Sequence, residues 1–187
     1  MNNVSINLNG TIILYRYYKM IGEKSVEQLT DRELNQAPSD ELHSVTILMK
    51  HISGSMISRW TNFRTEDGEK PWRNREQEFV NDFSSRKELI EYWEKAWDVL
   101  FTALDSIEIS ELNDIIYIRN EGHTLHEAID RYLAHVSYHI GQIVYLSKWL
   151  RGDNWETLTI PKGKTEEFNL QKFSLPKSTG FYKDRLK

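Results

Sequence analysis

The sequence contains no cysteine, which excludes disulfide bonds, thiolate metal ligands and a cysteine nucleophile. It also lacks any apolar run close to the roughly 20 residues that a membrane-spanning helix needs. The N-terminus, MNNVSINLNG, has no basic segment followed by an apolar stretch, so no signal peptide is indicated. We therefore expect a cytoplasmic protein with no membrane partner.

Basic residues are in the minority, and the net charge of the chain is −4. Residues 151–187 hold eight Lys or Arg against five Asp or Glu, so the acidic excess lies within residues 1–150. An acidic body argues against nucleic acid as a partner. A length of 187 residues suits a single domain with its own core. We expect a domain over residues 1–150 and a C-terminal tail, 151–187, that packs on it or extends from it.

Helical spacing of apolar residues appears first in the N-terminal third of the chain. Residues 8–34 are predicted to form one helix, and Pro38 separates it from the next. Ser39 and Asp40 are typical helix-starting residues, so a second helix is expected from there to about residue 63. Its apolar stripe consists of Leu42, Val45, Leu48, Ile52, Met56 and Trp60.

A long polar loop, residues 64–84, precedes the third helix. Loops of this length inside compact domains tend to be functional or mobile. Ser85 and Glu88 have the spacing of a capping box and indicate where the third helix begins. Its amphipathic stripe is the clearest in the chain: Leu89, Trp93, Trp97, Leu100 and Leu104.

Residues 114–120, DIIYIRN, are rich in β-branched side chains and are expected to be extended. Thr124 and Glu127 form a second capping box, which indicates where the last long helix begins. Gly152 is a suitable terminator for that helix. The buried side of this helix is predicted to be Leu125, Ile129, Tyr132, Val136, Ile140 and Ile143. Four long helices without a convincing sheet indicate an all-α four-helix bundle.

The segment AHVSYHIGQIVYL carries the strongest chemical signal. His135 and His139 are four residues apart on a helix, which places both imidazoles on one face. Two such rings can converge on one metal ion at about 2.0–2.1 Å per bond. The alternative is a pair of packed or hydrogen-bonded core histidines. Val136 follows His135 where zinc proteases have glutamate, so this pair supplies no general base.

A metal site in a bundle needs a further ligand from a facing helix, and His51 is the best candidate. Small serines, such as Ser55, surround it in sequence and leave room for an ion and a ligand. The competing interpretation is an ordinary, partly exposed histidine. His43, His123 and His126 fit the site less well and are interpreted as structural or surface residues. The prediction is one divalent ion, zinc or nickel, on His51, His135 and His139.

The loop sequence GEKPWRNREQEF concentrates two arginines beside a tryptophan. Arginine forks match carboxylates and phosphates, so Arg73 and Arg75 are candidate substrate-binding residues. A solvated loop anchored to the bundle by Trp72 and Phe79 is the alternative. Gln142, one turn beyond His139, is either a pocket residue beside the site or a solvated polar residue.

These residues give the chain a resemblance to the DinB-like superfamily, also called the DinB/YfiT-like metalloenzymes. The resemblance rests on KHISGSMISRW around His51, on LAHVSYHIGQIVYLSKWL with its histidine pair, and on the loop DGEKPWRNREQEF, and it covers roughly residues 5–150. It implies a four-helix bundle that holds a divalent metal on three histidines. Characterised members of this superfamily include S-transferases and isomerases that use thiols such as bacillithiol. The resemblance therefore implies an activity of this kind, and it implies a homodimer formed through helix packing.

The leading functional hypothesis is a metal-dependent enzyme with a small-molecule substrate, a thiol S-transferase or a related hydrolase. The second hypothesis is a non-catalytic metal-binding stress-response protein, because no general base is evident. The third is a helical interaction module that binds no metal. Convergence of the three imidazoles in space distinguishes the first two hypotheses from the third.

Overall fold

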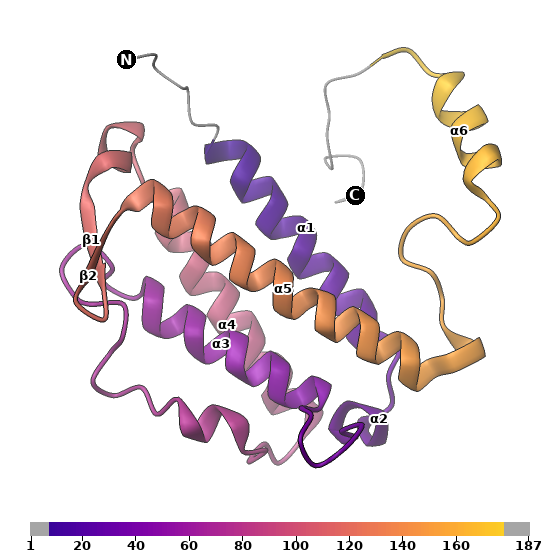
Figure 1. The fold of residues 1–187 in the computed structure, drawn as a ribbon, viewed down its shortest axis with the longest axis horizontal. Coiled ribbons are helices and arrows are strands. Elements are labelled where there is room, and N and C mark those ends of the chain that lie inside the picture. The colour runs from indigo at the N-terminus through magenta and orange to yellow at the C-terminus, as the bar shows by residue number, and fades with distance from the viewer. Residues whose placement is uncertain (1–7, 178–187) are drawn as a thin grey trace.

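The computed structural model describes residues 8–177, which fold into an all-α protein with one small hairpin. Four long helices, α1 (Leu8–Glu27), α3 (Val45–Trp60), α4 (Arg86–Asp105) and α5 (Leu125–Arg151), lie alongside one another (Figure 1). Helix α3 packs against α4 and α5, and α1 packs against α5. The expected bundle of four long helices is confirmed.

Large apolar side chains fill the space between the helices. The predicted stripe of α4 is buried throughout, from Leu89 to Leu104, and so is the predicted stripe of α5, from Leu125 to Ile143. Helix α3 is the most enclosed of the four, since nearly all of its residues are buried. A polar side chain on α3 must therefore find a partner inside the protein.

The first helix is shorter than predicted, because the chain leaves the helix after Glu27 and starts a separate helix, α2 (Asp31–Asn35). Thr30 caps α2 in an extended conformation, with ψ 164°, which a residue inside a helix cannot adopt. Its hydroxyl accepts from the backbone N–H of Glu33, and the Glu33 carboxylate accepts from the N–H of Thr30 at 2.7 Å. This capping box was not identified from the sequence. It starts a separate helix and so divides the single helix that was expected over residues 8–34.

The second long helix starts later than predicted. Ser44, not Ser39 or Asp40, is the N-cap of α3, and its hydroxyl accepts from the N–H of Ile47 at 3.3 Å. Residues 39–42 form a turn instead, and Leu42, predicted to be buried, is 55% exposed. The helix begins where a cap residue directly precedes a run that can be buried completely.

The polar loop between α3 and α4 is confirmed and contains one 3-10 turn, η1 (Glu76–Phe79). The Ser85 hydroxyl caps α4 by accepting from the N–H of Glu88. The second half of the predicted capping box differs, since the Glu88 carboxylate accepts from the N–H and hydroxyl of Ser84. Ser84, and not Ser85 as predicted, therefore donates to the Glu88 carboxylate.

The extended segment near residue 115 is also confirmed. After the 3-10 turn η2 (Ile109–Asn113), strand β1 (Ile115–Ile118) pairs antiparallel with β2 (Glu121–Thr124). The hairpin leads directly into α5, whose N-terminus has the predicted capping box of Thr124 and Glu127. The hairpin lies at one end of the bundle (Figure 1).

Helix α5 ends as predicted at Gly152, whose φ of 54° favours glycine. The 3-10 turn η3 (Gly152–Asn154) follows, and Glu156 then exchanges hydrogen bonds with Gln28 of the loop after α1. Helix α6 (Thr165–Phe173) has no buried residue. Across residues 8–177, no helix combines the length and apolar character needed to cross a membrane.

Candidate metal centre

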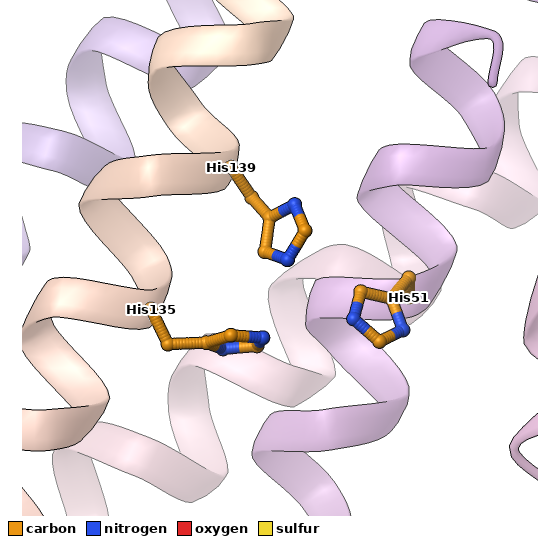
Figure 2. Close-up of side chains that lie close together, drawn as sticks. All are labelled: His51, His135 and His139. Atoms are coloured by element: carbon orange, nitrogen blue, oxygen red, sulfur yellow. The ribbon is translucent and has the colours of Figure 1, made fainter. Parts of the chain in front are cut away.

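The three predicted ligands, His51, His135 and His139, come together in the structure. One ligand atom from each imidazole lies within 4.8 Å of the others. The ring centroids are 5.6 Å apart for His51 and His135, 5.0 Å for His51 and His139, and 4.7 Å for His135 and His139. Figure 2 shows the rings pointing toward one another across the space between α3 and α5. Three imidazoles at this spacing can hold one divalent ion.

Hydrogen bonds orient two of the three rings. Nδ1 of His51 lies 2.9 Å from Glu78 Oε2, and Nδ1 of His139 lies 2.7 Å from Gln142 Oε1. A carboxylate and an amide oxygen accept hydrogen bonds, so each Nδ1 carries its proton and donates it. The Nε2 atoms of both rings therefore keep their lone pairs for a metal. Ligand histidines in metalloproteins are held by this type of outer hydrogen bond.

The third ring contains an unpaired atom. Within residues 8–177, Nδ1 of His135 is buried and has no hydrogen-bond partner. Burial is the main reason that the pKa of His135 falls to about 3, and the neighbouring His139 and His51 lower it further. Burial also lowers the pKa of His139, although its hydrogen bond with Gln142 opposes the shift. Both rings are thus neutral near pH 7, the state in which imidazole binds metals, and the donor set fits a divalent cation.

The carboxylate that orients His51 belongs to Glu78, in η1. Both of its oxygens are occupied, because Nε of Arg73 donates to Oε1 at 2.8 Å and one Arg73 Nη donates to Oε2 at 3.0 Å. Burial tends to raise the pKa of Glu78, but the hydrogen bonds from His51 and Arg73 outweigh it and the pKa is lowered. Glu78 is therefore an ionised acceptor that holds His51 in place.

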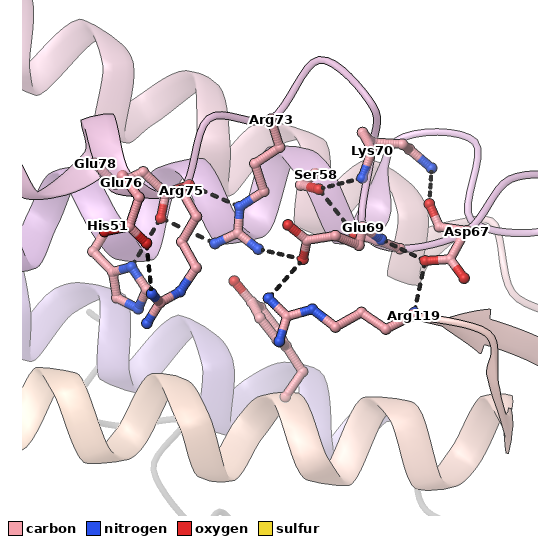
Figure 3. Close-up of polar contacts among 12 residues, drawn as sticks. His51, Ser58, Asp67, Glu69, Lys70, Arg73, Arg75, Glu76, Glu78 and Arg119 are labelled. Carbon is pink, nitrogen blue, oxygen red and sulfur yellow. Dashed lines mark hydrogen bonds and ion pairs between the residues drawn. The ribbon is translucent and has the colours of Figure 1, made fainter.

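Further contacts fix the loop that carries Glu78, and one of them, between Ser58 and Lys70, is drawn in Figure 3. Nζ of the buried Lys50 donates to the carbonyl oxygens of Gln77 and Val80, both at 2.8 Å. The Ser58 hydroxyl, also on α3, donates to the carbonyl of Gly68 and accepts from the N–H of Lys70. The loop is thus attached to α3 on both sides of His51, and the position of Glu78 is set by the same helix that carries the ligand.

Gly54 is the residue that lets Glu78 approach α3 so closely. A Cβ atom at Gly54 would lie 2.8 Å from Cδ of Glu78 and closer still to Oε1. Gly54→Ala is expected to displace the carboxylate from His51 and to weaken zinc binding by about 10–100-fold, the usual effect of losing an outer hydrogen bond. Competition with a chromophoric chelator measures the affinity.

Gly141→Ala is the matched control for this variant. Gly141 lies on α5, two residues from His139, and an added Cβ would meet nothing within 4 Å. Alanine there is expected to leave the zinc affinity unchanged and to stabilise the helix by about 0.5–1 kcal/mol. Equal zinc affinities for the two variants would contradict the role of Glu78.

Acid is expected to destabilise the metal-free protein through His135. The unfolded side chain binds a proton near pH 6.5 and the folded one near pH 3, so between these values the unfolded state holds more protons. The free energy of unfolding, measured by urea titration with a chelator present, should fall as the pH is lowered through this window. His135→Gln, which does not titrate there, should show a smaller slope. Identical slopes would refute the assignment.

The two predicted substrate-binding arginines lie beside the site but have different surroundings. Arg73 is enclosed and pairs with Glu69 and Glu78. Arg75 is half exposed, pairs with Glu76 and lies over the Phe79 ring at 5.0 Å. Substrate binding by either arginine stays a prediction.

The other histidines lie outside the triad. The exposed His43 stacks on Phe79 at 4.9 Å, and Phe79 in turn stacks on His51 at 5.1 Å. His123 lies 2.9 Å from an Arg131 nitrogen, and His126 pairs with Asp130 at 3.1 Å. Glu78 and Gly54 were assigned no role in the sequence, because only the fold brings the loop back onto α3.

Comparisons with known proteins identify a family and a solved structure that this chain resembles. A crystal structure described as the conserved protein of locus from Enterococcus faecalis matches with a TM-score of 0.59 and 21% identity, over 76% of this chain and 95% of that one. At this identity the match shows a shared fold. A search of curated proteins finds no match. The family described as "Protein of unknown function (DUF1572)" matches residues 4–164, most of the chain, and the protein therefore belongs to this family.

Proposed function

We propose that this protein is a metal-dependent enzyme of the DinB-like superfamily, a low-molecular-weight-thiol S-transferase or a related hydrolase. The convergence of His51, His135 and His139, with two Nε2 atoms free, carries the proposal. A divalent ion on three neutral imidazoles lowers the pKa of a coordinated thiol or water and so supplies a nucleophile near pH 7. Zinc and nickel are the proposed ions, since both suit imidazole ligands.

The residues around the triad favour thiol chemistry over hydrolysis. Glu78 is the carboxylate hydrogen-bonded to a ligand, and both of its oxygens are already engaged by His51 and Arg73. It is therefore poorly placed to remove a proton from water as a general base. A thiol has a lower pKa than water and depends less on such a base. This comparison supports S-transfer as the first candidate.

A cavity of about 500 Å³ beside the triad supports a small-molecule substrate. Gln142, which accepts the hydrogen bond from His139, also lines this cavity. The other lining residues include Leu48 and the exposed Tyr145 and Trp149, so the wall is largely apolar. Binding sites for small molecules commonly combine an apolar wall with a few polar groups. An electrophile with an apolar part suits this space.

Thiol transfer is tested with the zinc- or nickel-loaded protein, a panel of cysteinyl thiols including bacillithiol, and monochlorobimane as the electrophile. Ester and amide substrates test hydrolysis in parallel. A rate that requires the metal is expected in the wild type and in His126→Ala, which changes a surface histidine. His139→Ala should show none. Absence of any metal-dependent rate over the whole panel would refute the enzyme proposal.

The second candidate is a non-catalytic metal-binding stress-response protein. The hydrogen bonds to both Glu78 oxygens favour this candidate as well, because they leave the Glu78 carboxylate poorly placed to act as a base. This function predicts tight, stoichiometric metal binding without turnover. It is therefore the interpretation that remains if the metal binds and every substrate fails.

We also propose that the protein forms a homodimer, as the superfamily resemblance implies. Tyr138 on α5 is 64% exposed and does not line the cavity, so it is available for helix packing. Light scattering after size-exclusion chromatography distinguishes a dimer from the 22.2 kDa monomer.

A further inference from the structure

Arg59 is a charged side chain whose partner is missing. It lies on α3, and its Nε atom is buried without a hydrogen-bond partner among residues 8–177. Within the same described part of the chain, its guanidinium takes part in no ion pair. Burial lowers the pKa of Arg59, although arginine stays protonated in proteins. A partly buried cation without a close counter-ion is more stable when a ligand supplies the opposite charge.

The charged groups that face Arg59 do not neutralise it. They are Glu69, Arg73 and Arg131, beside the phenol of Tyr132. Glu69 already pairs with Arg73 at 2.9 Å and with Arg119 at 3.2 Å. The two other arginines add positive charge. The region around Arg59 therefore has an excess of positive charge that an anion would reduce.

Arg59 lies on α3, and its guanidinium reaches the Tyr132 ring of α5, the helix that carries His135 and His139. It follows His51 by eight residues, a little over two helical turns and about 12 Å along the axis. Long side chains on a helix lean toward its N-terminus, which for Arg59 is the direction of His51. Its guanidinium carbon is 5.5 Å from the centre of the Tyr132 ring, which is itself 5.5 Å from the His135 ring. Tyr132 thus neighbours both the guanidinium and the metal centre.

We propose that Arg59 binds a carboxylate of the substrate, at the end of the metal centre away from the apolar cavity. Helices α3 and α5 run in opposite directions (Figure 1), so Leu48 and Gln142 mark one end and Arg59 and Tyr132 the other. A carboxylate matches the planar guanidinium fork and the excess of positive charge around it. The inference rests on the proposed function and narrows its substrate to a small molecule that carries a carboxylate.

The probes are mercaptoacetate, 3-mercaptopropionate and 4-mercaptobutyrate, each beside its uncharged amide, titrated into the zinc-loaded full chain. For at least one of the three acids, binding should be tighter than that of its amide by a factor of about ten or more, as expected for a charge-assisted hydrogen bond. The same acid should shift the NMR signal of the Arg59 Nε–H, which is identified by its loss in Arg59→Lys. Arg59→Gln should bring the acid-to-amide ratio close to one.

Three results would overturn the inference: equal binding of acid and amide in the wild type, an unchanged preference in Arg59→Gln, or a preference lost in Arg75→Gln instead. The first result is measured on the wild type, so it tests the inference even if Arg59→Gln does not fold. If the chain takes up no zinc, the proposed function fails separately. Benzoate and benzamide on the metal-free protein, with the same NMR signal, then test Arg59 alone. Zinc binding and turnover without a carboxylate preference would refute only the role of Arg59.

Discussion

Alanine at His139 is expected to abolish stoichiometric zinc binding, with a loss of affinity well beyond the roughly 100-fold caused by losing an outer hydrogen bond. The reason is geometric, since each of the three imidazoles supplies one ligand atom and all three atoms lie within 4.8 Å of one another. Removing one ring leaves two nitrogens, too few for an ordinary zinc site. His51→Ala and His135→Ala should behave alike. Elemental analysis after dialysis against a weak chelator measures the effect.

His126→Ala controls for the loss of a histidine as such. His126 lies on α5 and pairs with Asp130, away from the triad. Its zinc content should equal that of the wild type. The circular dichroism of all four variants should stay helical, because the apolar cluster that holds the helices together contains none of these histidines. Full zinc occupancy in any of the three triad variants would contradict the assignment of that residue.

Alanine at Trp97 is expected to lower the free energy of unfolding by about 3–5 kcal/mol, the range measured when a buried large aromatic side chain is truncated. Trp97 is fully buried at the centre of α4, with Trp93 and Phe101 each 5.5 Å away between ring centroids. The variant loses buried apolar area and leaves a cavity that close-packed neighbours cannot fill. Urea unfolding of the metal-free protein measures the change.

Trp149→Ala is the matched control for Trp97→Ala. Trp149 lies near the end of α5 and is 55% exposed. Its truncation removes the same side chain from a surface position, where effects usually stay within about 0.5 kcal/mol. A similar loss of stability in both variants would mean that Trp149 is covered in solution, for instance by a second copy of the chain.

The long helices and the ligands could be predicted because both depend on local spacing. His135 and His139 share a face whatever the rest of the chain does, and the stripe from Leu89 to Leu104 can be buried only on one side of a helix. His51 required one further assumption, that its helix faces α5. The structure fulfils this assumption, since α3 packs against α5.

The errors came from caps and from contacts between distant residues. Thr30 and Ser44 are cap residues, but other serines and acidic residues nearby in the sequence are equally suitable, and tertiary packing decides among them. The contact of Glu78 with His51 joins residues 27 apart through a loop without periodicity. Gly54 carries no signal until the position of that carboxylate is known.

The most direct test of the metal centre is a crystal structure of the zinc-loaded protein, with data collected on both sides of the zinc absorption edge. An anomalous difference peak should lie between His51, His135 and His139, about 2.0–2.1 Å from a nitrogen of each ring. The hydrogen bonds from His51 to Glu78 and from His139 to Gln142 should persist. An ion bound elsewhere, or no peak between the three rings at saturating zinc, would contradict the account.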